Sequence, residues 1–317
     1  MGEGAIVVTG GAGFVGSHLV ERLLAEGRRV VCVDNFAPFY SRHLKRRNLA
    51  RAMGHPGFRL VEVDVCSRRL RDALEGEEVS AVVHLAARPG VRQSFRQPAP
   101  YLRDNVVGTL NVASLCRRMG VRRLVLASSS SVYGITEGAV SEDAPCRPIS
   151  PYGASKLAAE AVASVLASQG TEVLAVRLFT VYGPRQRPDM AIARFAASLL
   201  RGRAIVLYGD GLVRRDFTYI DDAVDGLVRA LQAPVSGFQV FNIGGGQPVS
   251  VRDAIGLLES CLGRRAALRF RPLLEGDPPL TWADIGRAQR LLGYRPRIGL
   301  AEGLERYADW LRQEGYG

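Results

Sequence analysis

The segment VVTGGAGFVGSHL, residues 7–19, decides the fold. It runs from a short β-branched stretch into an amphipathic one, and Gly10, Gly13 and Gly16 lie between the two with the spacing G-x-x-G-x-x-G. In a strand–turn–helix unit, one glycine permits the tight turn, one lets a pyrophosphate approach the backbone, and one lets helix and strand pack closely. The phosphate would bind amides at the positive end of the helix. An ordinary structural turn is the alternative, so the loop needs support from the residues that follow.

That support comes from an acidic residue at the end of the next strand. The stretch RVVCVD ends at Asp34, 18 residues after Gly16. A carboxylate there can accept hydrogen bonds from the adenosine ribose hydroxyls, and it repels a 2′-phosphate. A helix-capping aspartate is the alternative for this residue alone. Loop, acid and spacing together predict dinucleotide binding, with NAD favoured over NADP.

Alternation of strands and helices predicts the fold class. Through residue 178 short β-branched runs alternate with longer amphipathic stretches, which indicates βαβ units and a doubly wound parallel sheet. The strands are apolar at nearly every position, as expected for strands covered on both faces. Expected strands lie at 5–10, 29–34, 58–65, 81–87, 123–130, 172–179, 204–211 and 238–246, and expected helices at 14–27, 101–120, 153–170, 191–202 and 281–294.

After about residue 180 the pattern changes to a smaller, interleaved lobe. Residues 180–190 are predicted as a loop, 214–232 as containing a helix capped by an aspartate, and the chain from Pro248 onward as helices and short loops. The predicted domains are a nucleotide-binding sheet domain of residues 1–178 plus 218–244 and a substrate-binding lobe of residues 179–217 plus 245–317.

Composition excludes several function classes. The net charge of +11 comes from dispersed arginines without a nucleic-acid motif, so we expect solvated helix faces and no nucleic-acid partner. No apolar run is long enough to span a bilayer, and MGEGAIVVTGG is typical of a strand and not of a signal peptide. Five scattered cysteines without a C-x-x-C pair predict neither a metal site nor a disulfide framework, and favour a cytoplasmic location.

A second cluster of polar residues follows the strand RLVLASSS. Residues 128–131 are all serine and would lie at the carboxyl edge of the sheet, where ligands of such sheets bind. Tyr152 then opens a helix, and Lys156 follows one turn later on the same face. A neighbouring ammonium and a positive nicotinamide would lower the tyrosine pKa from about 10, so that the phenolate could take a proton from a sugar hydroxyl. The bare spacing also fits an ordinary helix, but with the dinucleotide loop it favours an enzyme.

Motifs along essentially the whole chain carry a family resemblance: TGGAGFVGSHL, HLAARPGVRQS, SSSSVYG, SPYGASKLAAE, RLFTVYGPRQRPDM, RRDFTYIDDAV, FNIGGG and ADIGRAQRLLGY. The sequence resembles the extended short-chain dehydrogenase/reductase family, in its NAD-dependent nucleotide-sugar epimerase/dehydratase branch. The resemblance implies a Rossmann sheet, bound NAD, a UDP-sugar substrate, and a homodimer formed by the helices after Tyr101 and Pro151. It also implies a catalytic triad of Ser129, Tyr152 and Lys156. The implied cofactor-binding residues are Gly10, Gly13, Phe14, Val15, Gly16, Asp34, Asn35, Asp64, Val65, Leu85, Ala86, Ala87, Asn105, Tyr152 and Lys156.

Departures from the family pattern narrow the reaction. Ser130 and Ser131 stand where the 4,6-dehydratases carry an Asp-Glu pair, so water elimination is not expected. The same loop lacks the glutamate of the UDP-glucuronate decarboxylases, and Thr180 replaces their asparagine. With RPDM at residues 187–190, the chain is most similar to UDP-glucuronate 4-epimerases. Their reaction passes through a 4-keto sugar formed and reduced in the same site.

The resemblance also assigns the substrate contacts. A uronate carboxylate needs hydroxyl, amide or arginine donors. Arg187 is the arginine candidate, with a solvated loop residue as the alternative. Arg215 resembles the diphosphate-binding arginine, but Glu275 occupies the position before Gly276 where many relatives have a second one, which leaves that contact open. The implied substrate-binding residues are Arg92, Ser129, Ser130, Thr180, Arg187, Met190 and Arg215. A UDP-glucose/UDP-galactose 4-epimerase and a non-catalytic NAD-binding regulator are the alternatives.

Overall fold

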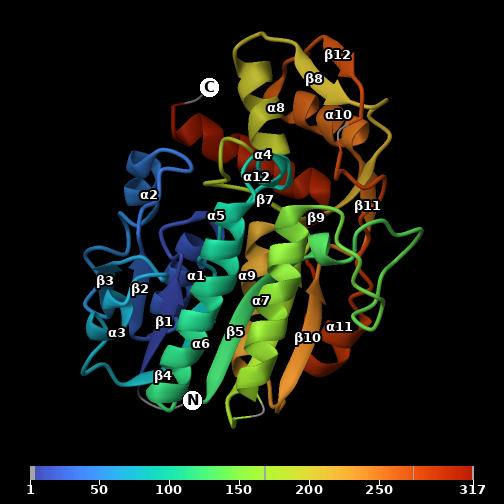
Figure 1. The fold of residues 1–317 in the computed structure, drawn as a ribbon. Helices are drawn as coiled ribbons and strands as arrows, with labels where there is room; N and C mark the ends of the chain where they lie inside the picture. The colour runs from blue at the N-terminus through green and yellow to red at the C-terminus, as the bar shows by residue number, and fades with distance from the viewer. Residues whose placement is uncertain (1–3, 168, 274, 316–317) are drawn as a thin grey trace.

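A seven-stranded parallel sheet forms the centre of the computed structural model, which describes residues 4–167, 169–273 and 275–315 (Figure 1). The strand order is β10-β6-β5-β4-β1-β2-β3, and every neighbouring pair is parallel. Chain order reverses between β1 and β4, which makes a crevice at the carboxyl ends of the strands. The strands are β1 (Ala5–Thr9), β2 (Val30–Asp34), β3 (Phe58–Glu62), β4 (Val79–His84), β5 (Arg123–Ser129), β6 (Glu172–Leu178) and β10 (Phe238–Ile243).

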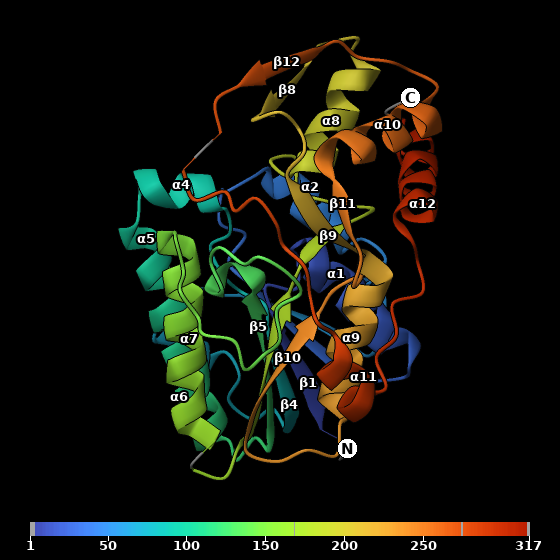
Figure 2. The same cartoon turned by 90° about the vertical axis from the view of Figure 1, so that its right-hand side faces the viewer.

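Helices cover both faces of this sheet. Ile6 and Val8 of β1 belong to one buried core, while Ala5 and Val7 belong to the other, because side chains alternate along a strand. Figure 2 shows α6 and α7 on one side of the sheet and α9 on the other. The elements of this domain are α1 (Phe14–Ala25), α2 (Arg42–Asn48), α3 (Arg69–Asp72), α4 (Val91–Arg96), α5 (Ala99–Tyr101), π-helical η1 (Leu102–Val107), α6 (Gly108–Arg118), 3-10 helical η2 (Ser130–Val132), α7 (Pro151–Ala167) and α9 (Ile220–Gln232). The predicted doubly wound α/β class is confirmed.

A smaller lobe lies beyond the carboxyl ends of the strands, at the top of Figure 1. It has a three-stranded sheet, β11-β9-β7, and a two-stranded sheet, β12-β8. Its elements are β7 (Thr180–Tyr182), α8 (Ala191–Leu200), β8 (Ile205–Tyr208), β9 (Arg214–Tyr219), β11 (Pro248–Ser250), α10 (Val251–Leu262), β12 (Leu268–Arg271) and α12 (Leu300–Gln313). The helix α11 (Gly286–Leu292), in the same stretch of chain, lies apart from the lobe, beside β10 (Figure 1). We propose the division 1–178 plus 218–244 and 179–217 plus 245–317 as the domain organisation, with α11 packed back against β10 and α9.

Four local predictions were only partly right. Residues 180–190 are not all loop, because β7 pairs with β9. The helix expected over 101–120 contains the π-helical turn η1 and α6 ends at residue 118, and the one expected over 281–294 begins only at Gly286. The helix within 214–232 has Tyr219 and not an aspartate as its N-cap. Asp222 instead accepts hydrogen bonds from the amides of Arg297 and Ile298, both at 3.0 Å, and so joins α9 to the chain leading into α12.

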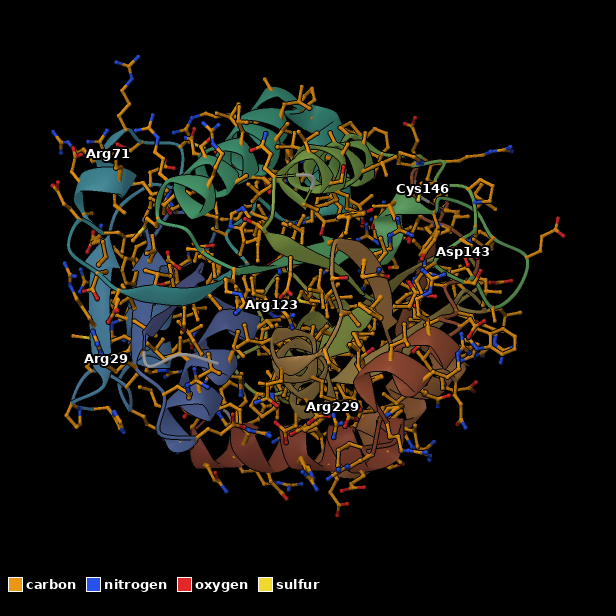
Figure 3. All side chains as sticks on the ribbon, turned by 90° about the horizontal axis from the view of Figure 1, so that it is seen from below. Arg29, Arg71, Arg123, Asp143, Cys146 and Arg229 are labelled. Carbon is orange, nitrogen blue, oxygen red and sulfur yellow. The ribbon has the colours of Figure 1, made fainter. Side chains whose placement is uncertain are left out.

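At the amino ends of the strands, opposite the crevice, one arginine connects β5 to the end of α9 and to β6. Arg123, labelled in Figure 3, begins β5. Its guanidinium donates to the carbonyls of Ala230, Leu231 and Ala233 at the end of α9, and it forms an ion pair with Glu172 of β6 at 2.5 Å. Carbonyls at a helix end lack partners within the helix, so a partly buried cation there stabilises the junction.

Three negative observations hold for the described part of the chain. No helix there is long and apolar enough to cross a membrane, and no group of three metal-ligating side chains comes together. The five cysteines within it are unpaired.

Candidate active site

One cavity of about 430 Å³ opens at the crevice. It brings together the glycine turn, the ends of β2, β4 and β5, the start of α7, and the loop after β7. All predicted site residues line it except Asn105, Arg92 and Arg215. Those that line it are Gly10, Gly13, Phe14, Val15, Gly16, Asp34, Asn35, Asp64, Val65, Leu85, Ala86, Ala87, Ser129, Ser130, Tyr152, Lys156, Thr180, Arg187 and Met190.

The glycine turn has the geometry of a phosphate-binding loop. Gly10 has φ +70°, and a Cβ there would lie 2.7 Å from the amide of Ala86. A Cβ on Gly16 would lie 2.2 Å from the carbonyl oxygen of Gly10, so only glycine lets α1 pack on the turn. No side chain caps the N-terminus of α1 at Gly13, which leaves its first amides available to an anionic ligand. These features fit the pyrophosphate of a dinucleotide.

Asp34 is held at the rim of this loop. Its carboxylate accepts hydrogen bonds from the amides of Ala12 at 3.1 Å and Phe36 at 2.8 Å. Only 6% of the residue is exposed, yet it lines the cavity, so unused lone pairs face the ligand. Asn35, which follows it, uses its side-chain oxygen to accept from the amide of Ala37.

Asp64 lines the cavity, whereas Asn105 lies behind the cavity wall. Asp64 accepts from the amide of Cys66 at 2.8 Å and from Arg103 at 2.9 Å. Asn105, in the π-helical turn, lies behind the wall: its amide donates to Ser155 of α7 at 2.8 Å, and its side-chain oxygen accepts from the amide of Arg88 at 2.6 Å. Asn105 therefore supports the loop after β4.

Ser129 and Tyr152 meet at the centre of the cavity. Ser129 accepts a hydrogen bond from the amide of Ser131 at 3.1 Å, and its hydroxyl lies close enough to Tyr152 to affect the tyrosine pKa. Burial raises the pKa of Tyr152, while the Ser129 hydroxyl and the charge of Arg187 oppose that rise. The sequence analysis expected the lysine to lower this pKa; in the cavity itself, burial dominates.

Lys156 lies one turn further along α7. Its Nζ donates to the carbonyl of Ala127 at 2.5 Å, and only 5% of the residue is exposed. Burial lowers the pKa of Lys156 to about 8, and the carboxylate of Glu160 opposes that shift. Lys156 also holds a buried neighbour neutral: burial and the lysine charge lower the pKa of His84 to about 3.

Arg187 enters the cavity already paired with a nearby acid. Its Nε and Nη2 each lie 3.0 Å from the carboxylate of Asp189, which leaves Nη1 free of that pair. The guanidinium also lies 5.8 Å from the ring centroid of Phe39. Thr180, on β7, also lines the cavity. A carboxylate ligand would meet a hydroxyl and a partly neutralised arginine there.

Arg92 and Arg215 converge outside this cavity. Both approach Asp277, Arg215 at 2.5 Å and Arg92 at 3.5 Å, and Arg92 lies over the ring of Tyr208 at 4.5 Å. Glu275 is exposed and takes no part. Arg92 and Arg215 thus form ion pairs with the same carboxylate, that of Asp277.

Tyr40 and Lys45 are among the residues of the cavity that the sequence analysis missed. Lys45 lies within the basic run RHLKRRN, a pattern typical of a solvated helix, although it points inward. Its position in the first helix after Asp34 was the one feature of the sequence that could have indicated a place near the cofactor site.

The chain matches the model of the "NAD dependent epimerase/dehydratase family" over residues 6–244. It is 40% identical to the UDP-glucuronate 4-epimerase of Thermodesulfobacterium geofontis, covering 98% of this chain and 97% of that protein.

Solved structures agree with this similarity. The UDP-glucuronic acid 4-epimerase of Bacillus cereus, in complex with UDP-glucuronic acid and NAD, has a TM-score of 0.93 and 39% identity, covering 98% of this chain and 99% of that one. MoeE5 in complex with UDP-glucuronic acid and NAD has a TM-score of 0.89 and 42% identity, covering 98% and 100%, and it has also been solved with UDP-glucose and NAD.

Proposed function

The chain belongs to the NAD dependent epimerase/dehydratase family, and we propose that it inverts C4 of a UDP-sugar, converting UDP-glucuronate to UDP-galacturonate. It is an isomerase with NAD as cofactor. The observation that carries this proposal is the single cavity that joins the glycine turn and Asp34 to Ser129, Tyr152, Thr180 and Arg187.

The acid–base work falls to Tyr152. As the phenolate it takes the proton from the C4 hydroxyl, and as the phenol it returns a proton to the oxygen of the 4-keto sugar. Ser129 donates a hydrogen bond to that oxygen. The Lys156 ammonium would stabilise the phenolate and, with NAD bound, could donate to a ribose hydroxyl of the cofactor. NAD, when bound, supplies the acceptor and donor of the C4 hydride, so none is consumed.

The glycine turn and Asp34 would hold that cofactor by its pyrophosphate and adenosine ribose. We assign Phe14, Val15, Asn35, Asp64, Val65, Leu85, Ala86 and Ala87 to the surrounding wall.

Thr180 and Arg187 would select the C5 carboxylate. Hydroxyls of Ser130 and Thr180, with the free Nη1 of Arg187, are donors for its two oxygens, while Ser129 donates to the C4 oxygen. The 4-keto intermediate is a β-keto acid, which loses CO₂ only when the breaking bond overlaps the carbonyl π system. Donors that hold the carboxylate near the carbonyl plane therefore protect the intermediate.

The UDP diphosphate would bind at Arg215 and Arg92. Both guanidinium groups form ion pairs with Asp277. A diphosphate carries more negative charge than a single carboxylate, so it would bind the two guanidinium groups more strongly than Asp277 does.

The exposed apolar side chains Leu102, Val107 and Leu110 support a homodimer. They lie on η1 and α6, beside α7, as the family resemblance implies for a four-helix interface. We propose this dimer and a cytoplasmic location for the protein.

A second candidate, UDP-glucose/UDP-galactose 4-epimerisation, is favoured by one observation. Asp189 occupies two guanidinium nitrogens of Arg187, so a neutral C5 hydroxymethyl group would leave no unpaired charge there.

Incubation of the purified protein, without added NAD, with UDP-glucuronate and separately with UDP-glucose tests both. Products are resolved by ion-exchange chromatography and NMR. UDP-galacturonate from the first, with little turnover of the second, is the expected result. Fast turnover of UDP-glucose with an idle uronate would overturn the carboxylate roles of Thr180 and Arg187. A UDP-pentose product would mean that the intermediate decarboxylates.

A further inference from the structure

The chain uses lysine at only two positions, and both line the cavity. Among its 42 basic residues, Lys45 and Lys156 are the lysines, and every other is arginine. The two residue types differ physically, since lysine offers a compact ammonium and arginine a planar fork. Lys156 serves the acid–base chemistry. Lys45 has no part in the reaction described so far.

Lys45 points in the opposite direction from its basic neighbours on α2. Arg42 and Arg46 leave 51% and 53% of their side chains exposed, and both pair with Glu62 of β3. The side chain of Lys45 is 10% exposed. The helix therefore presents its three arginines to solvent and its lysine to the cavity.

The ammonium of Lys45 is short of acceptors. Its Nζ lies 3.8 Å from Oδ1 of Asp34, beyond hydrogen-bond distance, and 5.2 Å from the ring centroid of Tyr40. Both oxygens of Asp34 already accept backbone amides, from Ala12 and Phe36. Burial lowers the pKa of Lys45, and the charge of Asp34 opposes that shift. The ammonium forms an ion pair with Asp34 but no hydrogen bond, and nearly buried donors without an acceptor are costly.

Tyr40, beside Lys45, also has a hydrogen-bond donor without an acceptor in the described part of the chain. Its hydroxyl is buried and has no hydrogen-bond partner among the residues that the structure describes, although the residue lines the cavity. Two unused donors thus lie next to the carboxylate proposed to bind the adenosine ribose. The matching acceptors are ribose and phosphate oxygens.

We propose that Lys45 and Tyr40 are further cofactor-binding residues, which donate hydrogen bonds to the ribose and phosphate oxygens of the adenosine half of NAD. This inference rests on the proposed function for the identity of the cofactor. It gives the lysine at position 45 a role: its compact ammonium lies between Asp34 and the Tyr40 ring and faces the cavity.

The test compares Lys45→Met, Tyr40→Phe and the matched control Arg46→Met from the same helix. NAD retained through purification is released by denaturation and quantified, and Kd values for NAD and ADP-ribose are measured by calorimetry on NAD-free protein. For Lys45→Met both Kd values should rise about tenfold or more, and for Tyr40→Phe about fivefold. Arg46→Met should stay within about twofold of the wild type. UDP affinity should not change in any variant.

A folded Lys45→Met protein with wild-type Kd for NAD would overturn the proposal. Where that variant does not fold, Tyr40→Phe decides, because it removes a single hydroxyl; wild-type NAD affinity in Tyr40→Phe would then overturn the proposal. Cofactor binding is measured apart from turnover. A wild-type protein that binds NAD but epimerises neither UDP-sugar would therefore defeat the proposed function without obscuring the result for Lys45.

Discussion

The hydroxyl of Ser128 donates a hydrogen bond to the carboxylate of Glu160, one turn beyond Lys156 on α7. Arg177 of β6 holds that carboxylate with two further hydrogen bonds, at 2.9 and 2.7 Å. Both Glu160 and Arg177 are 4% exposed. A buried network therefore joins the catalytic helix to two strands.

This network fixes the spacing of the catalytic groups. Lys156 donates to the carbonyl of Ala127, and Ser128 donates to Glu160. Both residues before Ser129 are thus bonded to the helix that carries Tyr152. Besides Tyr152, the titratable groups near Lys156 are Glu160 on its own helix and neutral His84 on β4.

Glu160→Gln should shift the pH dependence of turnover. Glu160 opposes the effect of burial on Lys156, so removing its charge lowers the lysine pKa further below about 8. The ammonium is then lost at a lower pH, and the alkaline limb of the kcat profile should move toward acid by about half a pH unit to one unit. The measurement is kcat for UDP-glucuronate across the neutral and alkaline range.

The controls for Glu160→Gln must also account for the loss of stability that follows when a buried charge is removed. Breaking a buried ion pair costs about 3–5 kcal/mol of folding free energy, so Glu160→Gln combined with Arg177→Met, which removes both charges, serves as a second variant. Glu142→Gln removes another buried carboxylate and should leave the limb where it is. An unmoved limb in both Glu160 variants would contradict the role given to Glu160.

Arg187→Met should change the preference between UDP-glucuronate and UDP-glucose more than it changes kcat. Loss of a charge-assisted hydrogen bond raises KM for UDP-glucuronate about tenfold, while KM for UDP-glucose stays within about twofold. Asp189→Asn is the opposing variant, because it frees two guanidinium nitrogens and should favour the uronate. Steady-state kinetics on both substrates measure this. Equal losses on the two sugars would show that Arg187 only supports the loop.

Arg92→Ala should weaken binding of any UDP-sugar. The side chain faces Asp277 beside Arg215, so its loss should raise the Kd of UDP about tenfold, and less at high salt because a charge is involved. Arg96→Ala, an exposed arginine on the same helix, is the matched control. Calorimetry at two salt concentrations gives both quantities. UDP affinity that is unchanged in Arg92→Ala would leave Arg215 as the sole arginine contact.

Leu110→Glu should dissociate the proposed dimer. A charge at the centre of an apolar interface loses the burial of that side chain and adds a desolvation cost. Light scattering coupled to size exclusion should give a dimer mass for the wild type and a monomer mass for the variant. Leu291→Glu, at a similarly exposed leucine on α11, should remain dimeric. A monomeric wild type would refute the assembly.

What the sequence predicted well depends on neighbours along the chain. The glycine turn, Asp34 and the Tyr152–Lys156 pair are set by spacing within one or two elements, and all of these residues line the cavity. Turn chemistry and helical periodicity are local properties, so the sequence alone carries them.

What it missed depends on distant contacts. In the sequence, Lys45 cannot be distinguished from the solvated arginines beside it, because its contact with Asp34 at the end of β2 appears only in the folded structure. In the same way, Thr180 was predicted as loop because its pairing with β9 is a tertiary contact. Asn105 lies within a π-helical turn that supports the wall and does not line it. The partner of Arg92, Asp277, lies 185 residues away in sequence. Such contacts follow from tertiary packing, which overrides local preference.

The scarcity of lysine has a practical consequence for labelling. Apart from the terminal amine, an amine-selective reagent has two targets on this chain, and both are largely buried in the walls of one cavity. Peptide mass spectrometry after mild acylation would therefore act as a footprint of cavity occupancy. Coupling to a solid support through surface lysines, a routine step for other proteins, has no suitable side chain to use here.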